Sequence, residues 1–362
     1  MSRGNATLKD LAKKLDLSIA TVSRALSGRS SMPKATRERV ETAAREAGYI
    51  PNRAARSLVS GRTGLAALAL SERHADSLNE PVCYLITELS SALSHHGIDL
   101  LLTTVKPGQS DMEVVDEIIH ARKADALILT GVRDGDPRIA PLVQTGFPFV
   151  AYGRPQEPDA WTTWVDSDAT SAAVQAAQLL VDLGHRRFVL IRSPEDTTFR
   201  DRWTMSVKHT LTLGGVPPAQ VTTLTIKQRD RATLLPEIKD ALERVEPTAI
   251  LALDDDLALA SIDAATGLGW HVPEQLSVIG FGASRAGTLL PPGLTTFDPD
   301  VRQCAKCLAQ VLDALLGGGD PRAHSLRHSI RPKLVSRGSH CPVRNAPVED
   351  LSEIRKRHME NA

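Results

Sequence analysis

The amino-acid sequence predicts an N-terminal all-α helix-turn-helix head followed by an α/β body of two doubly wound parallel-sheet lobes. Three short stretches with helical periodicity lie in the first fifty residues, whereas apolar runs alternate with helical stretches from about residue 62 onward. A chain of 362 residues can bury more than one core, and 42% hydrophobic and 24% charged content is typical of a globular protein. We expect four segments: a head (6–51), a connecting segment (52–61), a two-lobed body (62–340) and a C-terminal tail (341–362).

The first two helices of the head follow from apolar spacing and a capping residue. The i, i+3, i+4, i+7 spacing of one helical face is occupied by Leu8, Leu11, Ala12 and Leu15. Asp16 and Leu17 break this pattern, and Ser18 can cap the helix that follows. The buried side of the second helix is expected to carry Val22, Ala25 and Leu26. Its exposed side is expected to carry Ala20, Ser23, Arg24 and Ser27.

A third helix completes the head. It is expected to begin at Pro33, which suits a first helical turn, and to stop at Gly48. Its buried side carries Val40, Ala43, Ala44 and Ala47. Three short helices with a tight turn between the first two form a helix-turn-helix.

The second helix has an outer face that suits a DNA major groove, because it is thin and carries no bulky acid. Thr21 and Ser23 can donate hydrogen bonds to phosphate oxygens, which fixes the register. Arg24 can bond a guanine edge with both prongs of its guanidinium, for roughly 1–3 kcal/mol of discrimination. Ile19 and Ala20 can contact thymine methyl groups. The alternative is a small helical bundle in which Arg24 has no such role.

Charge is divided unequally along the chain, although the total is zero. Residues 1–62 hold 13 Lys and Arg against 5 Asp and Glu, a net of +8, and the remainder holds 30 against 38, a net of −8. A basic head on an acidic body indicates a polyanionic partner. A simple basic tail would also be positive, but tails rarely carry helical periodicity.

The body is expected to contain parallel sheets. Eight apolar runs are candidate strands: LAALAL, IDLLLTT, DALILT, FPFVAY, RFVLIR, VTTLTI, TAILAL and LSVIGF. Amphipathic stretches such as ATSAAVQAAQLLVDLG and LALASIDAATGLG lie between them, which favours strands covered on both faces. Eight strands over about 280 residues suggest two lobes rather than one sheet. A cleft between the carboxyl ends of the strands of two lobes is the natural ligand site.

The head resembles the DNA-binding head of LacI/GalR transcription regulators over residues 6–61, through ATLKDLAKKLDLSIATVSRALSG and TRERVETAAREAGYIPNRAARSLVSG. The resemblance implies a regulator, most simply a repressor, that binds a double-stranded DNA operator. It assigns the recognition helix to Ser18, Ile19, Ala20, Thr21, Ser23 and Arg24.

The stretch IPNRAARSLVSG corresponds to the hinge of that family. In the family this segment forms a helix on the operator, and two such helices, one from each subunit, insert a leucine into the minor groove. The resemblance assigns this leucine to Leu58, with Asn52, Arg53, Ala55 and Arg56 on the same helix. The alternative is a plain linker in which Leu58 rests against the body.

The body resembles the same family through LLVDLGHRRFVLI, PTAILALDDDLALASIDAATGLGWHVPEQLSVIGF and PPGLTTFDPD. This implies a periplasmic-binding-protein-like fold that binds a small effector, expected to be a sugar or a sugar derivative. The family's effector positions fall on Ser71, Arg154, Asp168, Arg202, Asp254 and Asp255. An Arg fork can hold two adjacent hydroxyls and Asp can accept from them. Alternatively, Asp168, Asp254 and Asp255 cap the helices that follow them.

Because of three departures from the family pattern, the sequence does not identify the effector. Gly282 follows VIGF, where an aspartate is usual, and Gly153 precedes Arg154, where an aspartate is also usual. Met205 replaces a glycine after Arg202. Fewer carboxylates mean fewer acceptors for sugar hydroxyls, so a chain that binds no effector is an open alternative. Three tryptophans lie near these positions and are expected to pack rather than to stack on a sugar: Trp161, Trp164 and Trp203.

No motif predicts an enzyme or a cofactor: GxGxxG, GxxxxGK[ST], HExxH and GxSxG are absent. Cys304 and Cys307 lie in a helix-like run, VRQCAKCLAQVLDALL, and are expected to pack. His324 and His328 are expected on one face of the strand-like HSLRHSI, without further ligands for a metal. The main rival to a regulator is a sugar-binding sensor without specific DNA readout.

The sequence also predicts the oligomeric state of the protein and its cellular location. Two heads held one helical turn apart by a homodimer would read a pseudo-palindrome. The tail offers only about one heptad of apolar spacing, which does not predict a tetramer: Val348, Leu351 and Ile354. No apolar run approaches the ~20 residues that span a bilayer, and MSRGNATLKD is no signal peptide. We therefore expect a cytoplasmic protein without a membrane partner.

Overall fold

The computed structural model describes residues 7–26, 32–49, 61–70, 80–106, 108–155 and 163–343. The chain divides into two compact units between Thr63 and Gly64. The first unit is the helical head and the second is the body. The predicted tail beyond residue 343 and the predicted hinge helix lie outside the described residues.

The head contains the three predicted helices, which are α1 (Leu8–Leu15), α2 (Ile19–Leu26) and α3 (Lys34–Glu46). Thr7 caps α1 reciprocally with Asp10, because the Thr7 hydroxyl accepts from the Asp10 amide and the Asp10 carboxylate accepts from the Thr7 amide. Ser18 Oγ accepts from the Thr21 amide at 3.1 Å and so starts α2, as predicted. Pro33 precedes the first turn of α3 as its N-cap.

The three helices enclose one apolar core. Its buried members are Leu11, Ala12, Leu15, Val22, Ala25, Val40, Ala43 and Ala44. Arg39 Nη2 donates to the Leu15 carbonyl at 2.6 Å, which joins α3 to the end of α1. Ala47, expected to be buried, is only half-buried because α3 ends at Glu46.

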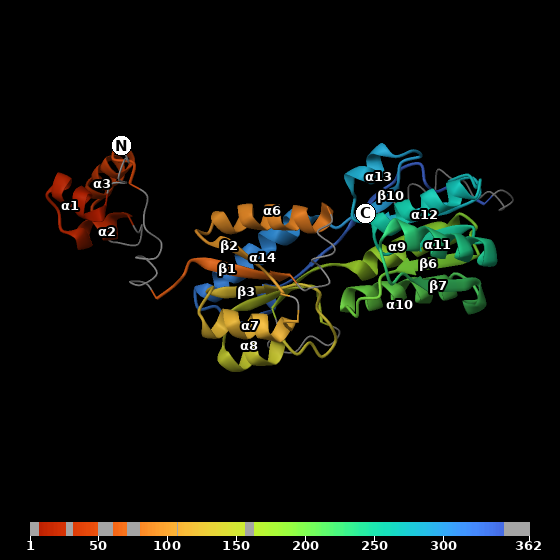
Figure 1. Cartoon of the computed structure of the whole chain (residues 1–362), viewed down its shortest axis with the longest axis horizontal. Helices are drawn as coiled ribbons and strands as arrows, with labels where there is room; N and C mark the ends of the chain where they lie inside the picture. Colours follow the sequence, from red (N-terminus) through yellow and green to blue (C-terminus); the bar gives the residue numbers. More distant parts are fainter. Residues whose placement is uncertain are drawn as a thin grey trace. The chain divides into compact units, whose positions relative to one another are not determined.

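The body contains two six-stranded sheets, as the alternation of strands and helices predicts (Figure 1). Every pairing in the sheet of lobe one is parallel, in the order β11-β5-β4-β3-β1-β2. Its strands are β1 (Leu65–Leu70), β2 (Asp99–Thr104), β3 (Ala126–Leu129), β4 (Phe149–Tyr152), β5 (Trp164–Ser167) and β11 (Arg327–Ile330).

The sheet of lobe two has the order β12-β10-β9-β8-β6-β7, with β12 antiparallel to β10 and the other pairs parallel. Its strands are β6 (Phe188–Arg192), β7 (Val221–Thr225), β8 (Ala249–Ala252), β9 (Ser277–Phe281), β10 (Thr295–Asp298) and β12 (Lys333–Val335).

Helices cover both faces of the lobe-one sheet (Figure 1). Ala66, Leu68 and Leu70 of β1 belong to the core under α6 (Glu80–Ser94) and α14 (Val301–Leu316). The alternate residues Ala67 and Ala69 belong to the opposite core, under α7 (Asp111–His120) and α8 (Ile139–Thr145). The sheet is therefore buried on both sides, which explains its nearly continuous apolar strands.

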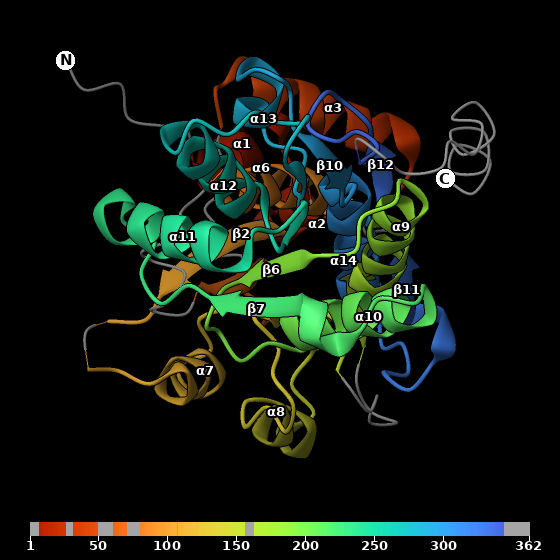
Figure 2. The ribbon, with the colours of Figure 1, turned by 90° about the vertical axis from the view of Figure 1, so that its right-hand side faces the viewer.

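The helices of lobe two lie in pairs around its sheet (Figure 2). One pair is α9 (Ala169–Asp182) and α10 (Thr198–Leu213), and the other is α11 (Arg231–Val245) and α12 (Asp255–Gly267). The short helix α13 (Arg285–Leu289) follows β9. Short 3-10 turns at Pro218–Gln220 and His324–Leu326 complete the described elements.

The chain passes between the lobes three times. It leaves lobe one after β5, returns after β10 to form α14 and β11, and leaves again to form β12. Each lobe is therefore completed by segments that are distant in sequence. The three passages lie at about residues 168, 299 and 331.

All eight predicted strands are present, and four further strands complete the sheets. β5 and β10 escaped prediction because they are rich in buried polar side chains, such as Asp166, Thr295 and Thr296. The strand-like HSLRHSI contains β11, but His324 lies in a 3-10 helix and only His328 in the strand. The expectation that both histidines share one strand face is therefore wrong.

The remaining structural expectations concern α14 and the membrane. α14 coincides with the predicted helical run, and Cys304 and Cys307 are buried in it as packing residues. Among the described residues, no helix combines the length and the apolar character needed to cross a bilayer.

Candidate functional site

The first candidate site is the outer face of α2. Ile19 is 50% exposed, and Ala20, Ser23 and Arg24 are exposed with it, whereas Val22 and Ala25 are buried against the head core. The helical period thus brings the predicted recognition residues to one side. The head core fixes the orientation of this side.

Local hydrogen bonds order the start of this face. The Ser18 and Thr21 hydroxyls lie 2.7 Å apart, and Thr21 is half-buried. Arg24 Nε donates to the Ala20 carbonyl at 3.3 Å, so the side chain lies along the helix. The predicted hinge residues Asn52, Arg53, Ala55, Arg56 and Leu58 lie outside the described residues, as do Ser27 and Ser71.

The second candidate site is a cavity of about 510 Å³ between the two lobes of the body. Several lining residues lie at the carboxyl ends of parallel strands, including Leu70 at the end of β1, Thr130 after β3 and Asp254 after β8. Ligands bind at this edge in doubly wound sheets. The predicted position of a ligand site is therefore matched by a cavity.

An ion pair stands in the lobe-two wall of this cavity. Arg229 Nη2 donates to Asp254 Oδ2 at 2.7 Å, while Asp254 Oδ1 accepts from the Leu257 amide at 2.9 Å and caps α12. Burial lowers the pKa of Arg229, but the carboxylates of Asp254, Glu195 and Asp256 together outweigh burial and raise that pKa above its usual value. A paired donor and acceptor at a cavity wall can bind two neighbouring hydroxyls.

Asp166, on β5, lines the cavity from lobe one. Burial raises the pKa of its carboxyl to about 6, although the nearby Arg202 guanidinium opposes this shift. Arg202 Nη1 lies 3.5 Å from Asp166 Oδ2, and the Arg154 amide donates to Asp166 Oδ1 at 3.3 Å. Asp166 therefore joins a residue of lobe two to the end of β4.

The first turn of α10 bonds to lobe one. The Thr198 amide donates to the Val132 carbonyl at 2.9 Å, and Thr198 Oγ1 donates to the Arg154 carbonyl at 2.9 Å. Arg202 Nη2 donates to the carbonyls of Arg154 and Pro155, each at 2.6 Å. We call Thr198, Arg202 and Asp166 the interlobe clasp.

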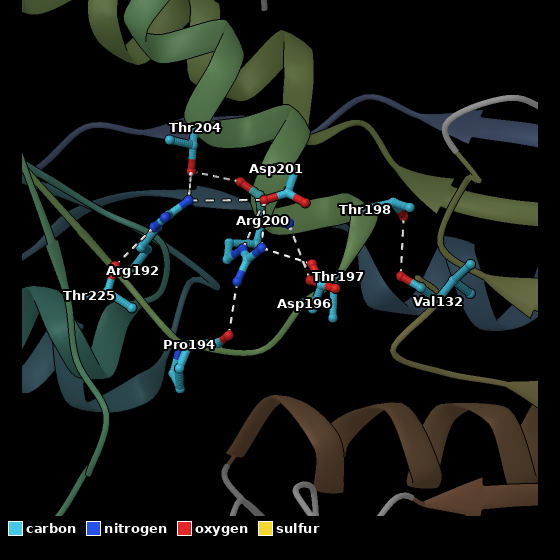
Figure 3. Close-up of polar contacts among 10 residues, drawn as sticks. All are labelled: Val132, Arg192, Pro194, Asp196, Thr197, Thr198, Arg200, Asp201, Thr204 and Thr225. Carbon is cyan, nitrogen blue, oxygen red and sulfur yellow. Dashed lines mark hydrogen bonds and ion pairs between the residues drawn. The ribbon is translucent and has the colours of Figure 1, made fainter. Parts of the chain in front are cut away.

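Figure 3 shows how the loop before α10 is held. Arg200 donates to the carboxylates of Asp196 and Asp201 at 2.7–3.0 Å and to the Pro194 carbonyl at 2.8 Å. Arg192 Nε donates to Thr225 Oγ1 at 3.1 Å. Loop 193–197 lines the cavity, so these bonds give one wall a defined shape.

The structure separates the predicted effector residues. Asp254 lines the cavity, but Arg154, Asp168, Arg202 and Asp255 are not among the lining residues. Asp168 caps α9 through the Ser171 amide, in agreement with the alternative role of a helix cap. Asp255 is buried between β10 and α13, where it accepts from Thr296 Oγ1 and from the Ser284 amide.

The remaining arginines and tryptophans also have structural roles. The Arg154 guanidinium lies over the Trp164 ring, 5.3 Å from its centroid, while Arg202 belongs to the interlobe clasp. Trp164 and Trp203 are buried, as the packing interpretation predicts, and Trp161 lies outside the described residues.

Sequence reasoning missed Arg229, Asp166 and Glu195 as lining residues. Arg229 lies four residues after the end of β7, and Asp166 lies within the unpredicted strand β5. A charged residue just beyond the carboxyl end of a predicted strand is the signal that could have found Arg229. Among the described residues, no group of His, Cys, Asp and Glu has the arrangement of a metal site.

Comparisons with known proteins identify a family for the head and for the body. Residues 7–52 match the family model for bacterial regulatory proteins of the lacI family, and residues 177–340 match a periplasmic binding protein-like domain. The transcriptional regulator AglR of Rhizobium meliloti is 30% identical over 272 residues, which cover 75% of this chain and 76% of AglR.

Two solved structures share the fold. The complex of the transcriptional regulator CelR with cellobiose has a TM-score of 0.67 at 26% identity, covering 92% of this chain and 99% of that chain. The lac repressor dimer bound to operator and the anti-inducer ONPF has a TM-score of 0.76 at 24% identity, covering 93% of this chain and all of that chain. The chain belongs to the lacI family of bacterial regulatory proteins, as a helix-turn-helix transcriptional regulator with a periplasmic-binding-protein-like body.

Proposed function

We propose that this protein is a repressor that binds a pseudo-palindromic operator as a homodimer and is controlled by a small molecule in the interlobe cavity. The observation that carries the DNA part is the outer face of α2, which is exposed, free of acidic residues and part of an N-terminal stretch (residues 1–62) of net charge +8. In this proposal Arg24 reads a guanine, Thr21 and Ser23 bind phosphates, and Ile19 and Ala20 contact thymine methyl groups. Ser18 holds the start of the helix.

The hinge proposal concerns residues 52–61. Leu58 inserts into the minor groove at the centre of the operator, and Asn52, Arg53, Ala55 and Arg56 line the same helix. Folding of this helix is coupled to DNA binding, so a change in the spacing of two bodies alters operator affinity.

The effector proposal rests on the cavity and its ion pair. Asp254 and Arg229 hold neighbouring hydroxyls of a sugar or a sugar derivative, and the related CelR structure, a complex with cellobiose, supports this class. Arg154, Asp168, Arg202 and Asp255 act behind the cavity wall: Arg154 and Arg202 through the interlobe clasp, Asp168 as the cap of α9, and Asp255 through its bonds to Thr296 and Ser284. Ser71 remains an expected contact after β1.

Dimer formation is supported by exposed apolar side chains of the body. Leu289 and Leu290, at the end of α13, are 75% and 53% exposed, which suits a contact with a second copy. The operator-bound relative is likewise described as a dimer. A two-fold pair of heads then matches two half-sites about one helical turn apart.

The test is selection from randomised duplexes followed by band-shift measurements on the full chain. We expect an inverted repeat to be selected and bound specifically, with affinity that falls steeply as salt rises. Transcription in vitro from a promoter carrying the site should decrease. A protein that binds ligands but selects no duplex would instead be the rival class, a sensor without specific DNA readout.

A further inference from the structure

The Asp166 carboxylate lies where lobe one meets lobe two. Asp166 is on β5 and is only 5% exposed, and it faces Arg202 of α10 across the lobes. A rotation that separates the lobes would move Arg202 away and admit water to this carboxylate. The exposure of Asp166 to water therefore depends on the position of the lobes, which is not so for a carboxylate buried inside one lobe.

The ionised form of this carboxylate is poorly bonded while the lobes are together. Among the described residues, the polar contacts of its oxygens are the Arg154 amide, 3.3 Å from Oδ1, and Arg202 Nη1, 3.5 Å from Oδ2. Both distances are longer than the roughly 2.7–2.9 Å of a strong charge-assisted hydrogen bond. An ionised carboxylate can accept about four hydrogen bonds, so its burial here loses more from dehydration than these contacts return.

Asp136 shows how a fully bonded carboxylate is held in the same lobe. Arg138 donates to both of its oxygens, at 2.9 and 2.7 Å, and the amides of Arg133 and Arg138 donate to it as well. Burial raises the pKa of Asp136, but these bonds outweigh burial and lower that pKa below its usual value. At Asp166, burial prevails and raises the pKa to about 6. Because both side chains are almost completely buried, the difference follows from the number of donors.

The other titratable groups around Asp166 do not stabilise its charge strongly. The Arg154 guanidinium adds a small favourable charge, whereas the Asp168 carboxylate repels an ionised Asp166. Tyr152 of β4 and Cys304 of α14 face it as neutral groups, since burial raises the pKa of the Tyr152 hydroxyl well above its usual value and that of the Cys304 thiol to about 12. Arg202 is therefore the main group that favours the ionised form.

The hydrogen bonds that join the lobes do not need a charge on Asp166. Arg202 Nη2 donates to the carbonyls of Arg154 and Pro155, each at 2.6 Å. The Thr198 amide and hydroxyl also donate to carbonyls of lobe one (Figure 3). Protonation of Asp166 removes a poorly bonded buried charge and leaves these hydrogen bonds in place. The neutral form of Asp166 therefore costs less to bury between the lobes than the ionised form.

We propose that closure of the two lobes is coupled to proton uptake by Asp166, so that acidification favours the closed arrangement, in which the interlobe clasp is formed. When the lobes separate, water reaches the carboxylate and its pKa returns toward the ordinary 3.8. The closed state thus binds this proton more tightly than the open state. The added preference for closure is complete below about pH 4 and is lost as the pH rises through 6. This coupling goes beyond the proposed function and depends on neither effector nor operator.

Hydrogen exchange at the Thr198 amide measures closure in the full chain. This amide donates to the Val132 carbonyl across the lobes at 2.9 Å, and as the first residue of α10 it has no acceptor inside its own helix. Its protection against exchange, corrected for the intrinsic pH dependence of exchange, therefore reports the closed arrangement. We expect this protection to fall about tenfold between pH 5 and pH 8, as a change in pKa from 3.8 to about 6 on closure requires.

Three variants test which group binds the proton. Asp166→Asn is uncharged at every pH and should keep the high protection of the acid form up to pH 8. Asp201→Asn is the matched control, because Asp201 lies on the same helix but bonds to Arg200 within lobe two, and it should respond to pH as the wild type does. Arg202→Gln removes the cation that favours ionised Asp166 and should move the midpoint of the change above pH 6.

Protection that is constant with pH in the wild type would overturn the proposal, as would an equal pH response in Asp166→Asn or a midpoint that Arg202→Gln leaves in place. Operator affinity at pH 5.5 and 7.5 tests the proposed function separately. Since wild type and Asp166→Asn have identical heads, any difference between their pH responses comes from the body. Equal operator responses together with the expected exchange results would reject control of DNA binding by the lobes and keep proton-coupled closure.

Discussion

Arg202 of lobe two and Asp166 of lobe one face each other across the lobes, with Arg202 Nη1 3.5 Å from Asp166 Oδ2. The same guanidinium donates to the carbonyls of Arg154 and Pro155 at 2.6 Å. Since both residues are largely buried, this contact loses little to solvent screening. The relative position of the lobes thus depends on a few named polar groups.

Replacing Arg202 tests this dependence. Arg202→Met should lower the free energy of unfolding of the body by roughly 2–4 kcal/mol, because it removes the cation beside the buried Asp166 carboxylate and the shared donor to the Arg154 and Pro155 carbonyls. Chemical denaturation at pH 7.5 measures the change. Arg244→Met removes an exposed ion pair to Asp240 and should cost less than about 1 kcal/mol. Equal losses in the two variants would contradict a role for the clasp.

Asp166 should make the body less stable as the pH rises. Burial raises its pKa to about 6 from the ordinary 3.8, so the folded state binds this proton more tightly than the unfolded state does. Its contribution is therefore complete below about pH 4 and is lost as the pH rises through 6, a change of about 3 kcal/mol. Asp166→Asn should remove this contribution from denaturation curves between pH 4 and 7. A variant with the wild-type slope would show that another group titrates.

His185 should make the body less stable as the pH falls, which is the opposite of the effect of Asp166. Its Nε2 donates to the Cys341 carbonyl and its Nδ1 accepts from Thr248 Oγ1, each at 3.0 Å, so both nitrogens are used in the neutral form. Burial lowers its pKa from 6.5 to about 4, and stability present above pH 6.5 is lost as the pH falls through 4. His185→Gln should abolish this acid sensitivity, also worth about 3 kcal/mol. Because the two groups oppose each other, each single variant should show a steeper pH profile than the wild type.

Arg24→Ala should relax sequence choice at one base position in each half-site, at a cost of roughly 1–3 kcal/mol on the preferred operator. Band shifts on operators with all four bases at that position measure the effect. Equal weakening on every sequence would identify Arg24 as a phosphate contact instead. Arg45→Ala, on the exposed side of α3 and in its last turn, is the control that should keep the base preference.

Leu58→Gly should weaken specific operator binding while leaving effector affinity unchanged, because it removes the minor-groove wedge and the helix preference of the hinge. Fluorescence anisotropy on the operator and calorimetry with the effector measure the two affinities. Unchanged operator affinity would contradict the insertion of Leu58 into the minor groove.

Local patterns predict those parts of the fold that depend on local physics. The spacing of Leu8, Leu11 and Leu15 sets α1, and Ser18 sets the start of α2. The long apolar runs set their strands because both faces of each sheet are covered. β5 and β10 were missed because bonds from distant residues, such as the one that the Arg337 amide donates to Thr295 Oγ1, hold their polar side chains inside.

The sequence predicted where the cavity lies but not which residues line it. Asp254 follows a strand and precedes a helix, so the same carboxylate caps α12 and faces the cavity. Arg202 and Asp255 have suitable chemistry, yet they are held by carbonyls and hydroxyls from elements far away in sequence. Only the three-dimensional structure shows whether such a residue lines the cavity or bonds to other parts of the protein.

The threefold passage of the chain between the lobes has a consequence for its synthesis. The strand that completes the sheet of lobe one, β11, ends at Ile330, and the strand that completes lobe two follows at Lys333–Val335. A nascent chain on the ribosome cannot close either core until nearly the whole body has been translated. The helical head, by contrast, has every residue of its core by Ala44 and can fold while the rest is still being made.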